Sequence, residues 1–281
     1  MRIHKVCSIL FLLLLSFVVT AQEYSMPNTE IKYLTSKINQ VSYKLYISLP
    51  ESYKDSTEKK YPTLYLLDAD YSFAIAKNIT DHLSQRNHLK EMIIVGIAYA
   101  GPNNYRINRT RDYTLVNSKE NVWFADIQEE YSGGGAQFLN FIENELIPFV
   151  QKSYRTTGFR VITGHSYGGL FSSWTLLTKP NLFTGYIIVS PSLWYHDKMM
   201  FQIKDDLKQT GAKTKVYFTV GDREVNNQWN MPDDLKRFVE NLKNREIKEL
   251  DIKLEIGENE THNSIFPSAL SNGLRFVFDG I

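Results

Sequence analysis

The chain has 281 residues, of which 43% are hydrophobic, and its 32 basic and 31 acidic side chains give a formal net charge of +1. This length and composition suit one large α/β domain with a sizeable core. The balanced charge excludes the basic surface typical of nucleic-acid partners, and the sequence contains no repeat or low-complexity tract.

Residues 1–21 have the organisation of a secretory signal peptide. Two basic residues precede an apolar run over residues 9–19, and Val19-Thr20-Ala21 supplies small residues before a predicted cleavage at Gln22. The run is too short to span a bilayer, although an uncleaved N-terminal anchor is the alternative. Cleavage would remove Cys7, the only cysteine. We therefore expect a periplasmic or secreted protein that has no disulfide and does not stay on the membrane.

Hydrophobic patterning predicts a hairpin followed by alternating strands and helices. Apolar residues alternate with polar ones over 41–49, which indicates a strand with one buried face, and residues 30–35 are expected to pair with it. Helical spacing is evident over 137–150 and again over 235–242. The other predicted strands are 63–67, 92–98, 160–163, 186–189, 215–220 and 252–256. This order predicts one α/β domain over 22–281, with a mostly parallel sheet, helices on both faces and a site at the carboxyl ends of the strands.

The sequence Gly164-His165-Ser166-Tyr167-Gly168-Gly169 directly follows a predicted strand and precedes a predicted helix. G-x-S-x-G in that setting is typical of a nucleophile elbow, a strained turn that exposes the serine hydroxyl. Ser166 is therefore the predicted nucleophile, and the backbone N–H of Tyr167 is expected to face the developing oxyanion. His165 is predicted to be structural, because a residue adjacent to the serine points away from it. An ordinary glycine-rich turn is the alternative.

A serine nucleophile needs a base and an orienting acid, which this fold supplies in the chain order Ser, acid, His. Only His196 and His262 follow Ser166, and His262 comes after the last predicted strand, where the base belongs. A surface-loop histidine is the alternative for His262. Glu224 is the favoured acid, because a residue a little beyond the preceding strand can reach the base. Asp222 stays open as the second candidate.

These motifs together resemble the putative-esterase branch of the α/β-hydrolases. That branch includes siderophore trilactone esterases, feruloyl and acetylxylan esterases, S-formylglutathione hydrolase and mycolyl transferases, and the chain is most similar to the siderophore-esterase-like subgroup. The resemblance implies an α/β-hydrolase fold and hydrolysis of carboxylic esters without metal or organic cofactor. The matching segments are Leu66–Asp70, Ile93–Ile97, Arg109–Thr114, Phe138–Tyr154, Gly164–Gly169, Ser190–Trp194, Gly221–Glu224 and Thr261-His262.

The resemblance also implies roles for single residues. The loop after an early strand would supply the second oxyanion N–H, which falls on Asp70 here. Ala69 stands where many relatives have glycine, and alanine is less free at positive φ. The acid of the family is the glutamate of a Gly-x-x-Glu turn, which corresponds to Glu224. Some siderophore esterases are nevertheless described as working with a Ser–His pair alone.

Two arginines are candidates for binding an anionic or oxygen-rich substrate. Arg109 and Arg111 are expected in a long polar loop at the rim of the site, and a guanidinium matches carboxylate, phosphate or catecholate oxygens. The alternative is that Arg111 holds the loop by pairing with Asp112 or Glu129. Gly133-Gly134-Gly135 has no preceding strand and is interpreted as a flexible approach to a helix, not as a phosphate site.

Trp194 and Tyr195 follow a predicted strand end and are expected to line an acyl or aryl pocket, with ordinary core aromatics as the alternative. The sequence thus predicts a serine esterase that acts on a small or oligomeric ester, with siderophore esters as one possibility. Carbohydrate esters, or acyl transfer to a sugar or lipid alcohol, are alternatives within enzymology. A catalytically inactive binding module of the same fold is the alternative outside it.

Overall fold

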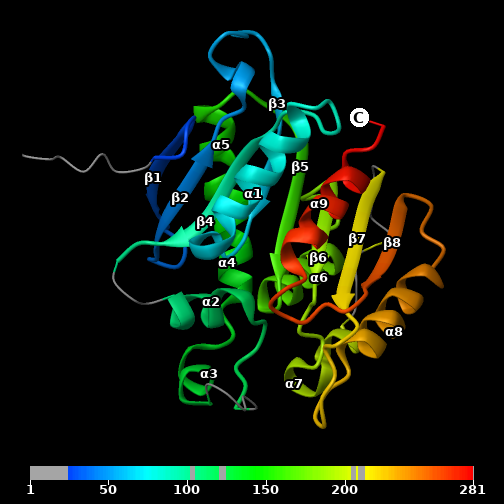
Figure 1. The fold of residues 1–281 in the computed structure, drawn as a ribbon. Coiled ribbons are helices and arrows are strands. Elements are labelled where there is room, and N and C mark those ends of the chain that lie inside the picture. Colours follow the sequence, from blue (N-terminus) through cyan, green and yellow to red (C-terminus); the bar gives the residue numbers. More distant parts are fainter. Residues whose placement is uncertain (1–24, 102–104, 120–124, 204–206, 208–212, 281) are drawn as a thin grey trace, which may run out of the picture.

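The computed structural model describes residues 25–280 apart from 102–104, 120–124, 204–206 and 208–212 (Figure 1). The predicted signal peptide lies outside the described residues. Within them, eight strands form one sheet in the order β1-β2-β4-β3-β5-β6-β7-β8. The strands are β1 (Thr29–Thr35), β2 (Ser42–Ser48), β3 (Tyr61–Leu66), β4 (Ile93–Tyr99), β5 (Thr156–His165), β6 (Gly185–Val189), β7 (Thr214–Gly221) and β8 (Leu250–Gly257).

The predicted hairpin is confirmed. β1 pairs antiparallel with β2, which in turn pairs antiparallel with β4, whereas all later neighbours in the sheet are parallel. The alternation in β2 has the expected cause, because Tyr43, Leu45 and Ile47 are fully buried on one face. Every residue of β3, β4 and β6 is buried, as expected for central strands covered on both sides.

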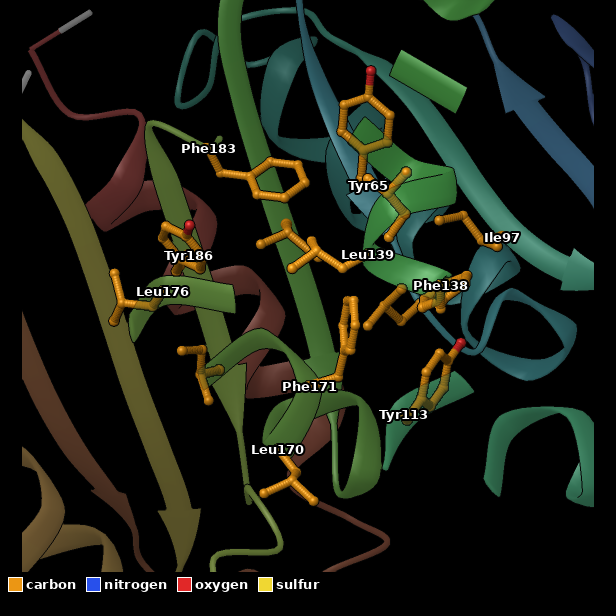
Figure 2. Close-up of a cluster of buried hydrophobic side chains, with 14 of the residues drawn as sticks. Tyr65, Ile97, Tyr113, Phe138, Leu139, Leu170, Phe171, Leu176, Phe183 and Tyr186 are labelled. Atoms are coloured by element: carbon orange, nitrogen blue, oxygen red, sulfur yellow. The ribbon is translucent and has the colours of Figure 1, made fainter. Parts of the chain in front are cut away.

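Helices cover both faces of the sheet (Figure 1). α1 and α9 pack on one face, and α4, α5, α6 and α8 contribute to the core on the other. In Figure 2, Phe138 and Leu139 of α4 lie beside Phe171 of α6 in this second core. The helices are α1 (Ala69–Ser84), α2 (Tyr105–Tyr113), α3 (Ala125–Tyr131), α4 (Gly135–Phe141), α5 (Ile147–Ser153), α6 (Tyr167–Thr178), α7 (Tyr195–Lys198), α8 (Met231–Lys243) and α9 (Phe266–Val277).

The predicted helix over 137–150 forms, but it is longer and is interrupted. A π-helical turn over Ile142–Leu146 joins α4 to α5. Pro148 follows at the start of α5 and has no N–H to donate, which locally disturbs the α-helical hydrogen-bond pattern. Short 3₁₀ turns at Glu51–Tyr53 and Met199–Phe201 complete the regular structure of the described residues.

The prediction of a long polar loop around Arg109 is wrong, because these residues form the helix α2. The helix is polar in sequence, yet it buries Asn108, Thr110, Asp112 and Tyr113. None of the helices in the described ranges is both long and apolar enough to cross a membrane.

Candidate active site

The segments that carry the predicted site residues all follow the carboxyl ends of parallel strands, at one edge of the sheet. Ser166 follows β5, the turn at Ser190 follows β6, Glu224 follows β7, and His262 follows β8. Parallel strands bring their carboxyl ends to the same edge, so residues far apart in sequence meet there.

Ser166 occupies the strained turn expected of a nucleophile elbow. Its backbone has φ 61° and ψ −117°, a conformation that non-glycine residues rarely adopt. The flanking glycines are required sterically. A Cβ at Gly164 would lie 2.3 Å from the carbonyl oxygen of Gly168, and a Cβ at Gly169 would lie 2.8 Å from that of Val189. The turn therefore accepts no side chain at either position without moving its backbone.

Hydrogen bonds fix the backbone of this turn. The N–H of Ser166 donates to the Val189 carbonyl at 3.0 Å, and the Ser166 carbonyl accepts from the N–H of Leu170 at 2.9 Å and of Ser192 at 3.2 Å. Tyr167 is the first residue of α6, so its N–H lies in the first turn of the helix, where backbone donors and the helix dipole favour negative charge. This places a backbone donor directly after the serine.

Glu224 and His262 form a direct hydrogen bond. The imidazole Nδ1 lies 2.6 Å from the carboxylate Oε2, with the glutamate side chain 1% exposed and the histidine 35% exposed. The second carboxylate oxygen accepts from the Ser190 hydroxyl at 2.5 Å and from the Gly221 N–H at 2.7 Å. A buried carboxylate with this many donors is held in one orientation. Its contact with Nδ1 leaves Nε2 as the nitrogen available for proton transfer.

The other candidate acid lies elsewhere. Asp222 is exposed, and its backbone N–H donates to the Gly257 carbonyl at 2.9 Å, which closes the turn after β7. Of the two carboxylates suggested by the sequence, the structure therefore brings Glu224, and not Asp222, to His262.

His165 lies against His262. The two imidazole rings have centroids 4.4 Å apart at an angle of 38°, and His165 Nδ1 is 3.3 Å from the Tyr71 hydroxyl. Burial, together with the adjacent His262 imidazole and the charge of Arg109, holds the pKa of His165 well below its ordinary value, so the ring is neutral. Sequence reasoning missed this contact, because a residue's direction at a turn does not reveal its distant neighbours.

A pocket of about 450 Å³ opens beside Ser166 and His262. Trp194 and Trp229 form part of its wall as a stacked pair, with ring centroids 5.4 Å apart and planes 18° apart. The sequence did not predict that Trp229 lines the pocket, because it lies in a loop after β7 that has no periodic pattern of apolar residues. The lining residues are Arg106, Arg109, Thr110, Ser166, Tyr167, Ser192, Trp194, Arg223, Glu224, Val225, Asn226, Trp229, Met231, Thr261, His262 and Asn263.

Trp194 lines this pocket as predicted, but the prediction for Tyr195 is wrong. The Tyr195 side chain is fully buried, and its hydroxyl donates to the Val116 carbonyl at 2.7 Å. Its ring packs edge-on against Tyr167, with centroids 5.7 Å apart. Consecutive residues at this turn point in different directions, so Tyr195 belongs to the core, which was the alternative interpretation.

Arg109 lines the pocket, but its guanidinium is engaged by a buried acid. Its Nε and Nη2 donate to the two oxygens of Asp68 at 2.9 and 3.0 Å, and the Asp68 side chain is 1% exposed. The Tyr105 hydroxyl donates to the same carboxylate at 2.8 Å, and the Tyr113 hydroxyl accepts from the Asp68 N–H at 3.1 Å. Arg109 therefore clamps the start of α1 to α2.

Arg111 does not line the pocket, so the prediction that it binds substrate there is wrong. Its guanidinium donates to both oxygens of Asp112 at 2.7 and 3.1 Å and to Asn108 Oδ1 at 2.8 Å. The Asp112 side chain is buried and requires a compensating charge. Of the two ion pairs suggested by the sequence, the one with Asp112 forms, while Glu129 pairs with Lys119 at 2.6 Å.

The left-handed residue of the loop after β3 is Asp68, with φ 55°, and Ala69 already begins α1. The alanine thus needs no positive φ, which explains why glycine is not required there. Asp70 is exposed at the second position of α1 and is not among the residues lining the pocket. Its N–H as the second oxyanion donor stays a prediction.

In the ranges that the structure describes, the histidine, aspartate and glutamate side chains do not gather in groups of three or more that could hold a metal ion.

Comparisons with known proteins give consistent matches. A model of the family described as "Putative esterase" matches residues 36–272. The chain is 29% identical over 270 residues to ferri-bacillibactin esterase BesA of Bacillus subtilis, covering 92% of each protein. It is 26% identical over 270 residues to a siderophore enterobactin esterase of Emericella nidulans, covering 84% of this chain and 89% of that protein.

Solved structures show the same similarity. A BES protein from Bacillus cereus aligns with a TM-score of 0.81 and 29% identity, over 92% of this chain and 98% of that chain. An IroE-like serine hydrolase from Shewanella oneidensis aligns with a TM-score of 0.77 and 29% identity, over 89% of this chain and 80% of that chain. These matches confirm the α/β-hydrolase fold and the resemblance inferred from the motifs.

Proposed function

Because the chain belongs to the "Putative esterase" family and is accordingly a carboxylic ester hydrolase, we propose that it cleaves siderophore esters through Ser166, His262 and Glu224. The observation that carries the proposal is the 2.6 Å hydrogen bond between Glu224 and His262, in the same pocket as the strained Ser166. A nucleophile at an elbow, a histidine with Nδ1 engaged and a buried carboxylate are the parts of a serine-hydrolase triad.

In the first half of the reaction, Ser166 Oγ attacks the ester carbonyl while His262 Nε2 takes its proton. Glu224 stabilises the imidazolium that forms, and the Tyr167 N–H donates to the oxyanion, with the Asp70 N–H as the predicted second donor. His262 then returns the proton to the leaving alcohol. A water molecule repeats these steps on the acyl-enzyme and releases the acid.

Siderophore esters are favoured by the pocket and by the relatives. The stacked Trp194 and Trp229 offer a flat apolar wall, and Arg106 and Arg223 line the same pocket with positive charge. Flat, oxygen-rich acyl groups would use both features, by stacking and by charge-assisted hydrogen bonds. Relatives that match over most of their length are described as esterases of ferri-bacillibactin and enterobactin.

We further propose that the protein acts in the periplasm or outside the cell on this small or oligomeric ester, without a nucleic-acid partner. The support is the predicted signal peptide over residues 1–21. N-terminal sequencing of the mature protein should read from Gln22, and an intact Met1 on soluble mature protein would contradict secretion.

A hydrolysis panel tests the substrate. Purified protein is offered a ferric siderophore trilactone, a feruloyl or acetyl polysaccharide ester and a short acyl ester, and kcat/KM is measured for each. We expect the siderophore to give the highest value, and a preference for the polysaccharide ester would move the assignment to carbohydrate esters. Product partitioning toward an added sugar or lipid alcohol would indicate acyl transfer. A fluorophosphonate probe should label Ser166, and lack of labelling would favour an inactive binding module.

A further inference from the structure

The turn after β6 places a second hydroxyl beside the proposed nucleophile. Ser192 Oγ lies 3.4 Å from Ser166 Oγ, and the Ser192 side chain is 1% exposed while lining the same pocket. A triad of Ser166, His262 and Glu224 does not require this hydroxyl. Its position against the reacting oxygen therefore calls for a role of its own.

The backbone around Ser192 is held without the help of its hydroxyl. Ser190, at φ 43°, donates its N–H to the Thr219 carbonyl at 2.8 Å and its hydroxyl to Glu224 at 2.5 Å. The Ser192 N–H donates to the Ser166 carbonyl at 3.2 Å. Pro191 packs against the elbow, so that a Cβ on Gly169 would lie 3.0 Å from its Cα. The Ser192 hydroxyl is thus presented by a rigid turn, and removing it should leave the turn in place.

The direction of the hydrogen bond between Ser192 and Ser166 follows from where the proton of each hydroxyl is needed. Ser166 gives its own proton toward His262 during reaction, so its Oγ is an acceptor for the Ser192 hydroxyl. At 3.4 Å the resting contact is long, but it should shorten as Ser166 Oγ gains negative charge. A fixed donor in a buried position stabilises charge that develops on its acceptor.

We propose that Ser192 is a further catalytic residue, which donates a hydrogen bond to Ser166 Oγ when that oxygen is expelled from the acyl-enzyme. This inference rests on the proposed serine mechanism. In deacylation, a bond forms between water oxygen and the acyl carbon, and the water proton moves to His262 Nε2. The bond from the acyl carbon to Ser166 Oγ then breaks, its electron pair stays on Oγ, and His262 returns the proton there.

The effect should fall mainly on deacylation. In acylation, the same hydrogen bond also stabilises the lone pair of the resting Ser166 and so lowers its nucleophilicity, which offsets part of the gain. In deacylation, Ser166 Oγ begins as a weakly accepting ester oxygen and leaves as a charged one, so the donor favours the transition state over the ground state.

The test compares Ser192→Ala with Ser192→Thr on an activated aryl ester, for which acylation is fast. For the alanine variant we expect kcat to fall about tenfold, the scale of one hydrogen bond to a charged group, with KM falling in parallel and kcat/KM nearly unchanged. Intact-protein mass spectrometry should show that the acyl-enzyme on Ser166 decays about tenfold more slowly than in the wild type. The threonine variant keeps a hydroxyl and should restore most of kcat.

Ser190→Ala is the matched control, two residues away in the same turn. It removes a donor to Glu224, which serves both half-reactions, so kcat and kcat/KM should fall together and the share of acyl-enzyme should not rise above that of the wild type. Wild-type kinetics for Ser192→Ala, or equal losses of kcat and kcat/KM, would overturn the inference while leaving the proposed function intact. Full activity in Ser166→Ala would instead overturn the proposed function itself.

Discussion

The two sides of Ser166 are built in different ways. On the side of β6 to β8, Glu224 and His262 come from short turns directly after strands, and a 2.6 Å hydrogen bond joins them. On the side of β3 and β4, Asp68 and Arg109 meet through an ion pair that bridges the start of α1 and the helix α2. Both carboxylates are 1% exposed, so each requires compensating donors.

The difference lies in the partner of each carboxylate. His262 is 35% exposed and can accept and release a proton, so the pair that it forms with Glu224 can take part in chemistry. Arg109 keeps its charge at all ordinary pH values, so its pair with Asp68 can only fix geometry. Of the two buried acids at this sheet edge, Glu224 thus belongs to the proposed reactive pair and Asp68 to a structural clamp.

The largest expected effect is the loss of esterase activity when the proposed nucleophile or base is removed. Ser166→Ala and His262→Ala should each lower esterase kcat at least about a thousandfold while leaving the protein folded, because each removes a member of one catalytic unit. The double variant should be hardly slower than either single variant. Steady-state kinetics with circular dichroism as a folding control measure this, and losses that multiply would show that the two residues act separately.

Breaking the clamp should instead damage stability. Arg109→Gln leaves the buried Asp68 carboxylate without its cation, which costs about 3 kcal/mol or more of unfolding free energy. Activity toward anionic and neutral esters should then fall by the same factor. Arg106→Gln is the control, since Arg106 lines the same pocket but is exposed. The free energy of unfolding of this variant should change by less than about 0.5 kcal/mol.

These two variants are compared by urea unfolding and by KM for an anionic and a neutral ester. A rise in KM confined to the anionic ester in Arg109→Gln, with unchanged stability, would return Arg109 to the role of a substrate-binding residue. That outcome would erase the contrast between the two sides of Ser166.

Amide substitutions distinguish the two candidate acids near His262. Glu224→Gln should lower kcat by about a thousandfold or more, because an amide cannot stabilise the imidazolium formed in the transition state. Asp222→Asn should have little effect, since Asp222 is exposed. The reverse ranking would move the orienting role to Asp222, and two small effects would indicate a Ser–His pair.

The same contrast explains how much the sequence could predict. The β2 alternation, the apolar parallel strands and the glycines around Ser166 are local patterns whose physical cause lies within a few residues. His262 followed from chain order, because the fold fixes which strand end delivers it. Such features need no knowledge of distant contacts.

The features that sequence reasoning missed depend on distant contacts. α2 is rich in polar residues, and its buried face is satisfied by partners such as Tyr43, whose hydroxyl bonds Asp112 at 2.9 Å. Arg109 pairs with Asp68, which is 41 residues away in the chain, and no local sequence pattern indicates this pairing. A tyrosine suits a core as well as a pocket, so only the direction of the Tyr195 side chain could distinguish the two roles.

The smallest expected effect concerns the histidine that joins the two sides. The ring of His165 lies tilted against that of His262, and the His165 carbonyl oxygen lies 3.5 Å from Nη2 of Arg109. Its pKa is well below the ordinary 6.5 in the folded protein, because burial disfavours the charged ring. In the unfolded chain, the ring takes up a proton as the pH falls through about 6.5, whereas the folded ring does not. The unfolded state thus binds more protons, and the folded state loses stability as the pH falls below that value.

Between pH 7 and 5.5, this single group should remove about 1 kcal/mol of the free energy of unfolding. His165→Phe keeps a ring against His262 but cannot titrate, so its stability should vary less over this interval by that amount. Urea unfolding at both pH values measures both proteins. An identical pH dependence in wild type and His165→Phe would mean that the pKa of His165 is the same in the folded and unfolded states. The folded ring would then take up a proton over this interval, and a charged ring would lie against the proposed base.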